Sequence, residues 1–209
     1  MYATLQWILP SVIGGVGLIN SKIKPTQKIV PTSFDSLAPP VINIPFEATN
    51  TSKINITGYA PSNSKVELLI DDGLKDTTTT KEDGSFEFND ISLNLGTNNI
   101  SGKTIGEKGT ESLPSKTLYV YYSNESPNLT VSDPEDNKTI QGGDKKITIK
   151  GKTDANIKIF INDSRIITNS NGDFSSEQPL NDGDNNFTVK AIDKSGNETS
   201  LSRKVTYNP

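Results

Sequence analysis

Apolar and polar residues alternate strictly in many short stretches of this chain, a pattern that predicts β-strands with one buried face. The clearest stretches are residues 54–58 and 147–151, where isoleucines alternate with Asn, Thr and Lys. Similar stretches follow at 66–70, 157–161 and 187–192, separated by clusters of Gly, Asn, Asp and Ser that are typical of turns. Asp-Gly at 83–84 and Asn-Gly at 171–172 predict hairpin turns.

The two halves of the chain repeat each other. The matching pairs are Gly58 with Gly151, Ile70 with Ile161, Phe86 with Phe174 and Asn98 with Asn185, and the offset changes only in turn-rich segments. From Asn98 onward we expect a constant offset, which aligns Lys116 with Arg203 and Leu118 with Val205. Each copy then has about seven short strands. The sequence therefore predicts an all-β protein with two tandem β-sandwiches, at residues 39–122 and 126–208.

The second copy carries motifs that resemble a known family. They are Ile161-Asn-Asp, Asn171-Gly-Asp-Phe, a run from Gly183 to Asn197 (Gly-Asp-Asn-Asn-Phe-Thr-Val-Lys-Ala-Ile-Asp-Lys-Ser-Gly-Asn) and Val205-Thr-Tyr207. With these motifs the copy resembles bacterial Ig-like modules of the glucodextranase domain-B type, and the first copy resembles them more weakly. The resemblance implies two Ig-like sandwiches, of a kind found in bacterial surface proteins and as non-catalytic parts of secreted glycan-active enzymes. The motifs specify a fold and not a ligand.

The N-terminal segment is apolar. Residues 1–21 contain no charged side chain, and as a helix they would span about 31 Å, close to the thickness of a bilayer core. We therefore predict a transmembrane helix at 1–21, followed by a linker rich in Pro, Lys, Ser and Thr at 22–38; a buried core helix is the alternative. An uncleaved anchor is favoured over a secretory signal, because no basic region precedes the segment and no small-x-small site follows it closely.

The charges next to this segment oppose the expected topology. Lys22, Lys24 and Lys28 follow it and no Lys or Arg precedes it, so the positive-inside rule alone would place the β-modules in the cytoplasm. We predict instead a single-pass protein of the cell membrane with extracytoplasmic modules. The modules resemble surface proteins, and extended domains translocate largely regardless of charge.

Composition argues against several classes of function. The chain has no Cys and no His, which excludes disulfides, thiol nucleophiles and the commonest general base. The net charge is −4, the early lysines leave the rest of the chain still more acidic, and no basic stripe with interleaved aromatics occurs. We therefore expect no catalytic residues, no cofactor and no nucleic-acid partner. The expected partners are the membrane, through residues 1–21, and an unidentified protein or glycan.

Two tyrosines are the candidate contact residues. Tyr119 and Tyr121 alternate with Leu118, Val120 and Tyr122, so they should point outward if the latter three face the core. Exposed aromatic rings stack on sugars or anchor a protein partner. We interpret the pair as a possible ligand or interdomain contact, with Thr206 and Asn208 as the polar counterparts in the second copy.

Two groups of carboxylates are candidates for a calcium site. Asp182, Asp184, Asp193 and Glu198 would supply oxygen ligands if they met near one end of the second sandwich, and Asp133, Glu135 and Asp136 lie near the domain junction. No spacing among them matches a calcium-binding loop, so solvent-facing carboxylates are favoured and we predict no metal site.

The functional hypothesis is a membrane-anchored, surface-exposed bacterial repeat protein that acts by non-covalent binding as a spacer, adhesion or envelope-assembly module. A glycan-binding accessory protein of the cell envelope is the alternative, suggested by the outward tyrosines. An enzyme acting on envelope polymers is a third possibility, and it would need a cleft with a buried carboxylate pair.

Overall fold

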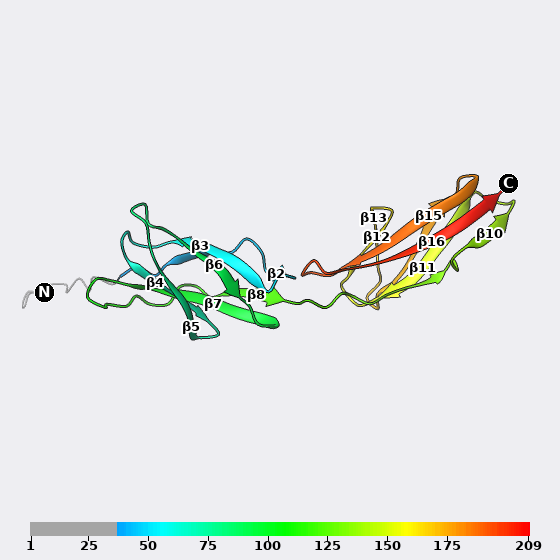
Figure 1. Cartoon of the computed structure of the whole chain (residues 1–209). Helices are drawn as coiled ribbons and strands as arrows, with labels where there is room; N and C mark the ends of the chain where they lie inside the picture. The colour runs from blue at the N-terminus through cyan, green and yellow to red at the C-terminus, as the bar shows by residue number, and fades with distance from the viewer. Residues whose placement is uncertain (1–36) are drawn as a thin grey trace, which may run out of the picture. The chain divides into compact units, whose positions relative to one another are not determined.

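The computed structural model describes residues 37–209, which form two β-sandwiches (Figure 1). The strands of the first are β1 (Val41–Asn43), β2 (Ala48–Thr49), β3 (Lys53–Tyr59), β4 (Lys65–Ile70), β5 (Gly73–Thr79), β6 (Ser85–Ser92), β7 (Gly96–Ile105) and β8 (Leu118–Tyr122). Those of the second are β9 (Leu129–Asp133), β10 (Lys138–Gln141), β11 (Lys146–Thr153), β12 (Lys158–Ile161), β13 (Ser164–Ile166), β14 (Asp173–Pro179), β15 (Gly183–Ile192) and β16 (Glu198–Asn208).

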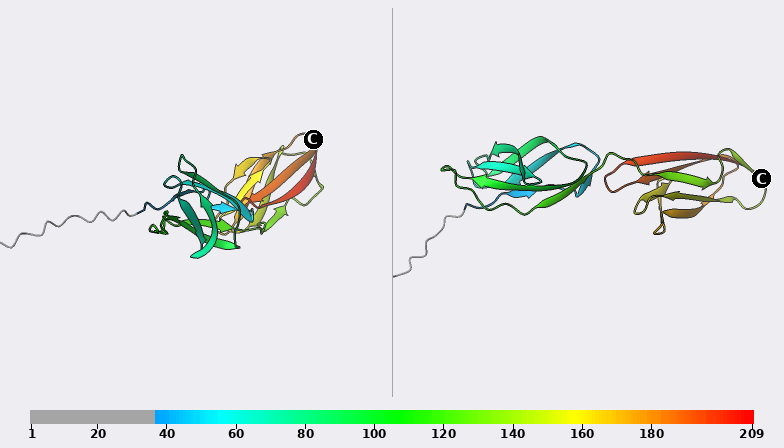
Figure 2. Two further views of the ribbon diagram at one scale, coloured as in Figure 1. Left: turned by 60° about the vertical axis from the view of Figure 1, so that its left-hand side comes forward. Right: turned by 90° about the horizontal axis from the view of Figure 1, so that it is seen from below.

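Each sandwich packs a three-stranded sheet on a five-stranded sheet (Figure 2). The orders are β1-β3-β6 on β2-β8-β7-β4-β5 and β14-β11-β9 on β10-β16-β15-β12-β13. The predicted all-β fold with two tandem sandwiches is therefore confirmed. Each sandwich has one strand more than the expected seven, because β2 and β10 are short strands that run parallel to the last strand of their sandwich.

The N-terminal predictions concern a part of the chain that the structure does not describe. The helix expected at residues 1–21 lies wholly outside the described range, and so does nearly all of the linker expected at 22–38. Among residues 37–209, no helix has the length and apolar character needed to cross a bilayer.

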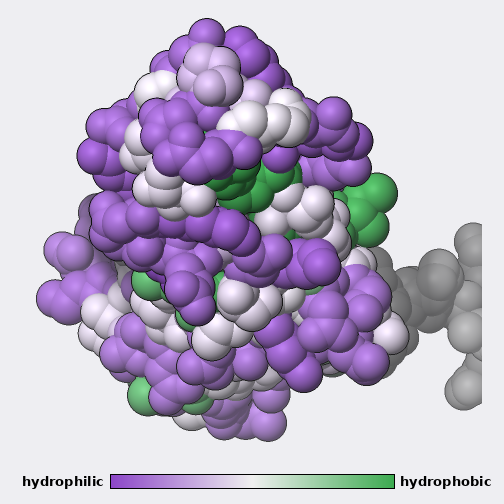
Figure 3. Space-filling model, turned by 90° about the vertical axis from the view of Figure 1, so that its right-hand side faces the viewer, coloured by the Kyte–Doolittle hydropathy of each residue, from purple (hydrophilic) through white to green (hydrophobic). Residues whose placement is uncertain are grey.

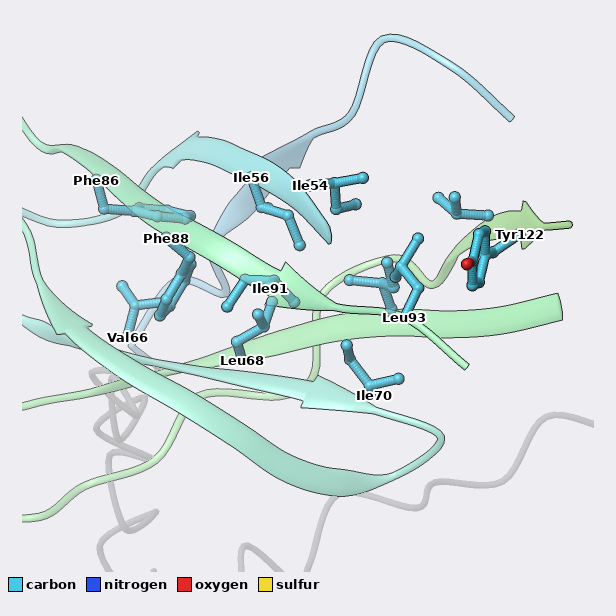
Figure 4. Close-up of a cluster of buried hydrophobic side chains, with 12 residues drawn as sticks. Ile54, Ile56, Val66, Leu68, Ile70, Phe86, Phe88, Ile91, Leu93 and Tyr122 are labelled. Atoms are coloured by element: carbon cyan, nitrogen blue, oxygen red, sulfur yellow. The ribbon is translucent and has the colours of Figure 1, made fainter. Parts of the chain in front are cut away.

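Each sandwich has its own apolar core, built by the alternating strand positions. In the first, Ile56, Val66, Leu68 and Ile100 are fully buried (Figure 4). The second core repeats this arrangement with a separate set of side chains: Val131, Ile147, Ile149, Ile159, Ile161, Phe174, Leu180, Phe187, Val189, Ala191, Val205 and Tyr207. Two independent cores explain how a chain with 32% hydrophobic residues forms two sandwiches.

A glycine and a phenylalanine pack together at the same place in both sandwiches. Gly151 in β11 faces Phe174 in β14, and Gly58 in β3 faces Phe86 in β6. A Cβ atom on either glycine would overlap the facing ring and a backbone carbonyl of the neighbouring strand. The phenylalanine ring therefore lies directly over the backbone, which is why both positions lack a side chain.

An asparagine at the start of β7 and of β15 holds the preceding turn. Asn98 is fully buried; its Nδ2 donates to the carbonyls of Asn94 and Gly96, and its Oδ1 accepts the N–H of Asn94. Asn185 makes the same three hydrogen bonds in the second sandwich. The pair appeared in the sequence only as a match between the copies, and its structural role was not predicted.

The Asp-Gly and Asn-Gly turns form, and a single antiparallel bridge between Thr168 and Phe174 closes the second one, but the predicted pairing of the flanking strands as hairpins is wrong. Gly84 and Gly172 have positive φ angles, as the sequence suggests. The flanking strands, however, belong to different sheets: β5 and β6 in the first sandwich, β13 and β14 in the second. The tight two-residue hairpins occur earlier, at Asp71-Asp72 and Asn162-Asp163, where all four residues have positive φ.

The final strands are aligned differently from the sequence prediction. Asn98 lies opposite Val120 and Asn185 lies opposite Val205, and in both copies the asparagine Nδ2 donates to that valine carbonyl. Val205 is thus the counterpart of Val120, and its predicted alignment with Leu118 is wrong. The shift is two residues, which leaves every side chain on its original face, so alternation alone does not reveal it.

Candidate binding groove

The structure places the two predicted tyrosines on β8, at the edge of the first sandwich. Val120 and Tyr122 are buried, Leu118 is half-buried, and Tyr119 is 64% exposed, so the predicted inward and outward faces are correct. The Tyr121 ring is partly exposed and lies 3.6 Å from the Nζ of Lys194. Whether either tyrosine contacts a ligand stays a prediction.

Tyr119 and Tyr121 line an open depression of about 550 Å³, here called the β8 groove. One wall is residues 116–121, and the other is formed by Ile44, Phe46 and Glu47, with Thr97 completing the lining. Ile44 and Phe46 also pack partly against the first core. The groove therefore combines apolar walls with one cation, Lys116, and one carboxylate, Glu47.

The remaining groove residues were not predicted from the sequence. Ile44 and Phe46 lie between β1 and β2, where the chain crosses from one sheet to the other. The signal that would have found them is a difference between the copies. Ile44 and Phe46 lie four and two residues before Ala48, and the matching positions before Thr139 in the second copy hold Glu135 and Asn137.

The structural counterparts of the tyrosines differ from those expected. With the corrected alignment, Tyr119 corresponds to Lys204 and Tyr121 to Thr206, instead of Thr206 and Asn208. Lys204 and Thr206 both contact Asp184: the lysine Nζ lies 2.8 Å from Oδ2 and the threonine hydroxyl donates to Oδ1 at 2.7 Å. This polar cluster in the second sandwich stands where the first sandwich has exposed aromatic rings.

The acidic residues considered for calcium do not converge. Asp182 and Asp184 lie at the start of β15 and Asp193 and Glu198 at its far end, so ten strand residues, about 30 Å, separate the two pairs. The alternative in which all four carboxylates meet at one end of the sandwich is wrong, because the two pairs lie at opposite ends of β15. Among residues 37–209, no group of three or more acidic side chains is placed to hold a metal ion.

These carboxylates instead pair with lysines at the surface. Lys145 lies 2.7 Å from Asp182, and Lys190 lies 3.8 Å from Glu198. Hydrogen bonds from Lys204 and Thr206 lower the pKa of Asp184, and the hydrogen bond to Asp182 raises the pKa of Lys145. These groups are exposed or half-buried at the surface, so each ion pair contributes little to stability. Asp133 and Asp136 are used similarly, by Lys138 and by the backbone N–H of Lys204.

Comparison with known proteins agrees with this fold. Residues 127–208 match the family described as glucodextranase, domain B. Over 175 residues the chain is 29% identical to Bacillopeptidase F of Bacillus subtilis (strain 168), a match that covers 82% of this chain but only 12% of that protein. Among solved structures, the fibronectin(III)-like modules of Clostridium thermocellum CbhA superpose with a TM-score of 0.55 at 19% identity, covering 81% of this chain and 94% of the other.

The family match concerns the second sandwich, whereas the structural similarity extends over 81% of the chain. The matched segment, 127–208, contains all eight strands of the second sandwich, and the first sandwich repeats its two sheets, its glycine–phenylalanine pair and its buried asparagine. Residues 127–208 therefore match the bacterial Ig-like glucodextranase domain B family, and the first sandwich is a second copy of the same fold.

Proposed function

We propose that this chain is a membrane-anchored bacterial protein that displays two Ig-like modules outside the cell and acts by non-covalent binding, as a spacer, adhesion or envelope-assembly module. The observation that carries this proposal is the composition of the buried positions. In residues 37–209 the buried polar side chains are Ser, Thr and Asn, and no Asp, Glu, Lys or Arg is buried. A general acid or base with a pKa raised by burial, as hydrolysis of envelope polymers requires, has no candidate there.

The surface supports a display role for the second module. Figure 3 shows one face that is mainly hydrophilic, with small apolar patches separated from one another. Lysines and carboxylates of the second module form ion pairs at its surface, such as Lys146 with Glu177 and Lys204 with Asp184. Such a surface keeps an exposed module soluble without creating a large apolar interface.

The relative Bacillopeptidase F does not extend this proposal to peptide cleavage. Its name describes a peptidase, but this chain corresponds to 12% of its length. The chain has no Cys and no His, so neither a Ser-His nor a Cys-His pair is available for nucleophilic catalysis. We therefore propose a non-catalytic role.

Protease treatment of intact cells tests the location. Cells that express the full chain with a C-terminal epitope are exposed to proteinase K, and the epitope is followed by immunoblot. Loss of the modules from intact cells is the expected result, and a cytoplasmic protein serves as the control for lysis. Protection until the cells are lysed would refute both surface roles, spacer and adhesion.

Glycan binding is the second candidate, and the β8 groove is the observation that favours it. Tyr119 offers an exposed ring, and Glu47, Lys116 and Thr97 offer polar groups beside it. Binding of the full chain to an array of bacterial envelope glycans, abolished by Tyr119→Ala, would support this role. An array without signal for the unmodified chain would remove it.

A further inference from the structure

The backbone of β8 is open at Tyr119. Across the β7–β8 ladder Tyr119 faces Asn99, whose backbone N–H and C=O are both bonded to Asp71 on the opposite side. The two residues therefore form a non-hydrogen-bonded pair, and the backbone groups of Tyr119 point to the outer edge of the sheet. On that edge Tyr121 donates its N–H to the carbonyl of Glu47, but β2 pairs only with residues 121–122. Within residues 37–209, neither β7 nor the backbone of a loop accepts a hydrogen bond from the Tyr119 N–H.

The second sandwich closes the same position. The backbone N–H of Lys204, the counterpart of Tyr119, donates to Oδ1 of Asp136 at 2.9 Å. The preceding residue, Arg203, donates hydrogen bonds from its guanidinium to the carbonyls of Val131 and Pro134. Its edge is therefore sealed by one carboxylate and one guanidinium.

The first sandwich has neither of these groups. Ala48 pairs with Tyr121 as Thr139 pairs with Thr206, which makes Pro45 the counterpart of Asp136. Leu118 stands in place of Arg203. The side chains of proline and leucine carry no hydrogen-bonding group, so neither can take the place of the Asp136 carboxylate or the Arg203 guanidinium, and the edge stays open beside the apolar side chains of the β8 groove.

The charges of the groove define what would fit it. Lys116 lies at the start of the β8 wall and Glu47 next to Tyr121, near its end. Neither is among the ion pairs formed within residues 37–209. An extended segment of about six residues would span this length. If it ran parallel to β8, as β2 does, it could pair with the β8 backbone only up to Tyr119, because the Tyr121 N–H is already bonded to the Glu47 carbonyl. Its first side chain would lie near Lys116, and its last would approach the Glu47 side chain at the end of the groove.

We propose that the β8 groove binds an extended segment of a partner protein, which pairs with the Tyr119 backbone as an added strand parallel to β8. The segment begins with an acidic residue opposite Lys116, carries apolar side chains at alternate positions that contact Ile44 and Phe46, and ends with a basic residue opposite Glu47. Main-chain hydrogen bonds hold such a strand, and the alternate side chains select it. This inference rests on the non-covalent binding role proposed above, but not on the side of the membrane where the modules lie.

A blocked hexapeptide, DTVTVK, tests the proposal on the full chain. Titration followed by amide NMR should shift residues 117–121 with a Kd on the order of 1 mM or tighter. At saturation the exchange of the Tyr119 amide should slow at least tenfold. The charge-reversed peptide KTVTVD should bind at least fivefold more weakly. No shift at residues 117–121 at several millimolar DTVTVK, or equal binding of both peptides, would overturn the proposal.

Two variants at one position separate a strand site from a stacking site. Tyr119→Pro removes the outward N–H at a position where an edge strand accepts proline, and it should weaken DTVTVK binding at least tenfold. Tyr119→Ala keeps the N–H and removes the ring, and it should change binding less than fivefold. The opposite order of effects would show that the ring and not the backbone is recognised, which contradicts the proposal.

A third variant keeps the test valid if Tyr119→Pro disturbs the fold. Pro45→Asp places at the edge the carboxylate that seals the second sandwich, and it should weaken peptide binding at least fivefold while leaving amide shifts outside the groove unchanged. Other occupants give distinct results. Glycan-array binding lost in Tyr119→Ala identifies a sugar site, and a concentration-dependent dimer abolished by Pro45→Asp identifies a second copy of this chain; either result would overturn the proposal. The protease experiment on cells decides the location independently.

Discussion

Replacing Phe174 by alanine tests the core of the second sandwich most directly. The ring is 4% exposed and lies over the backbone at Gly151. Phe-to-Ala changes in protein cores cost about 3–5 kcal/mol, from lost burial and the cavity that remains. A domain of this size is stable by roughly 4–12 kcal/mol in total. We therefore expect Phe174→Ala to leave residues 126–209 marginally stable or unfolded at 37 °C.

Thermal and urea unfolding of a fragment comprising residues 126–209 measure this change. The unmodified fragment should show a β-type circular dichroism spectrum and one cooperative transition, because it contains all eight strands and its own core. For a domain of 60–100 residues each 1 kcal/mol shifts Tm by about 4–8 °C, so Phe174→Ala should lower it by at least about 12 °C. Ile167→Ala is the matched control, since Ile167 is 91% exposed and its loss should change stability by about 0.5 kcal/mol or less.

A double-mutant cycle tests the contact itself. Gly151→Ala alone should destabilise the fragment by about 1–3 kcal/mol or more, because its Cβ would overlap both the Phe174 ring and the Thr130 carbonyl. In the Phe174→Ala background the ring overlap is gone, so Gly151→Ala should cost at least about 1 kcal/mol less. Additive effects, or a Phe174→Ala Tm within about 5 °C of the unmodified fragment, would refute this account of the core.

Three further predictions follow from local contacts. Asn185→Ala should destabilise the second sandwich by about 2–3 kcal/mol in urea unfolding, because it leaves the Asn181 N–H and two backbone carbonyls without their partner, whereas exposed Asn186→Ala should have little effect. Carbon-detected NMR titration should show Asp184 with a pKa below its ordinary value, and Thr206→Val should raise it. Because folding lowers the pKa of Asp184, its interactions with Lys204 and Thr206 contribute to the free energy of unfolding above the unfolded-state pKa, near 3.9, and this contribution is lost as pH falls through the folded-state pKa. Asp184→Asn should therefore make stability fall less steeply at acidic pH. The hydrogen bond from the Lys204 N–H to Asp136 should protect that amide in hydrogen exchange. Asp136→Ala should remove the protection, whereas Glu135→Ala should not.

The sequence alone determined the features that depend on period and composition. Alternation identifies strands and their buried faces, so it correctly placed the isoleucines of residues 54–58 and 147–151 in the core and Tyr119 at the surface. The internal repeat divided the chain into two sandwiches. The absence of Cys and His restricted the chemistry before any fold was known. Each of these is a local property or a comparison along the chain.

The tertiary structure decided the features that depend on which strands meet. A two-residue shift preserves alternation, so only the pairing of Asn185 with Val205 revealed the alignment of the last strand. The Asp-Gly turn has the local chemistry of a hairpin, but the core requires the chain to cross to the other sheet there. The β8 groove is open because Pro45 and Leu118 occupy the positions of Asp136 and Arg203, whose side chains form hydrogen bonds along the corresponding sheet edge of the second sandwich. In each sandwich these residues lie far apart in the sequence. They meet because a short early strand, β2 or β10, pairs with the last strand, β8 or β16, and no local sequence pattern predicts this pairing.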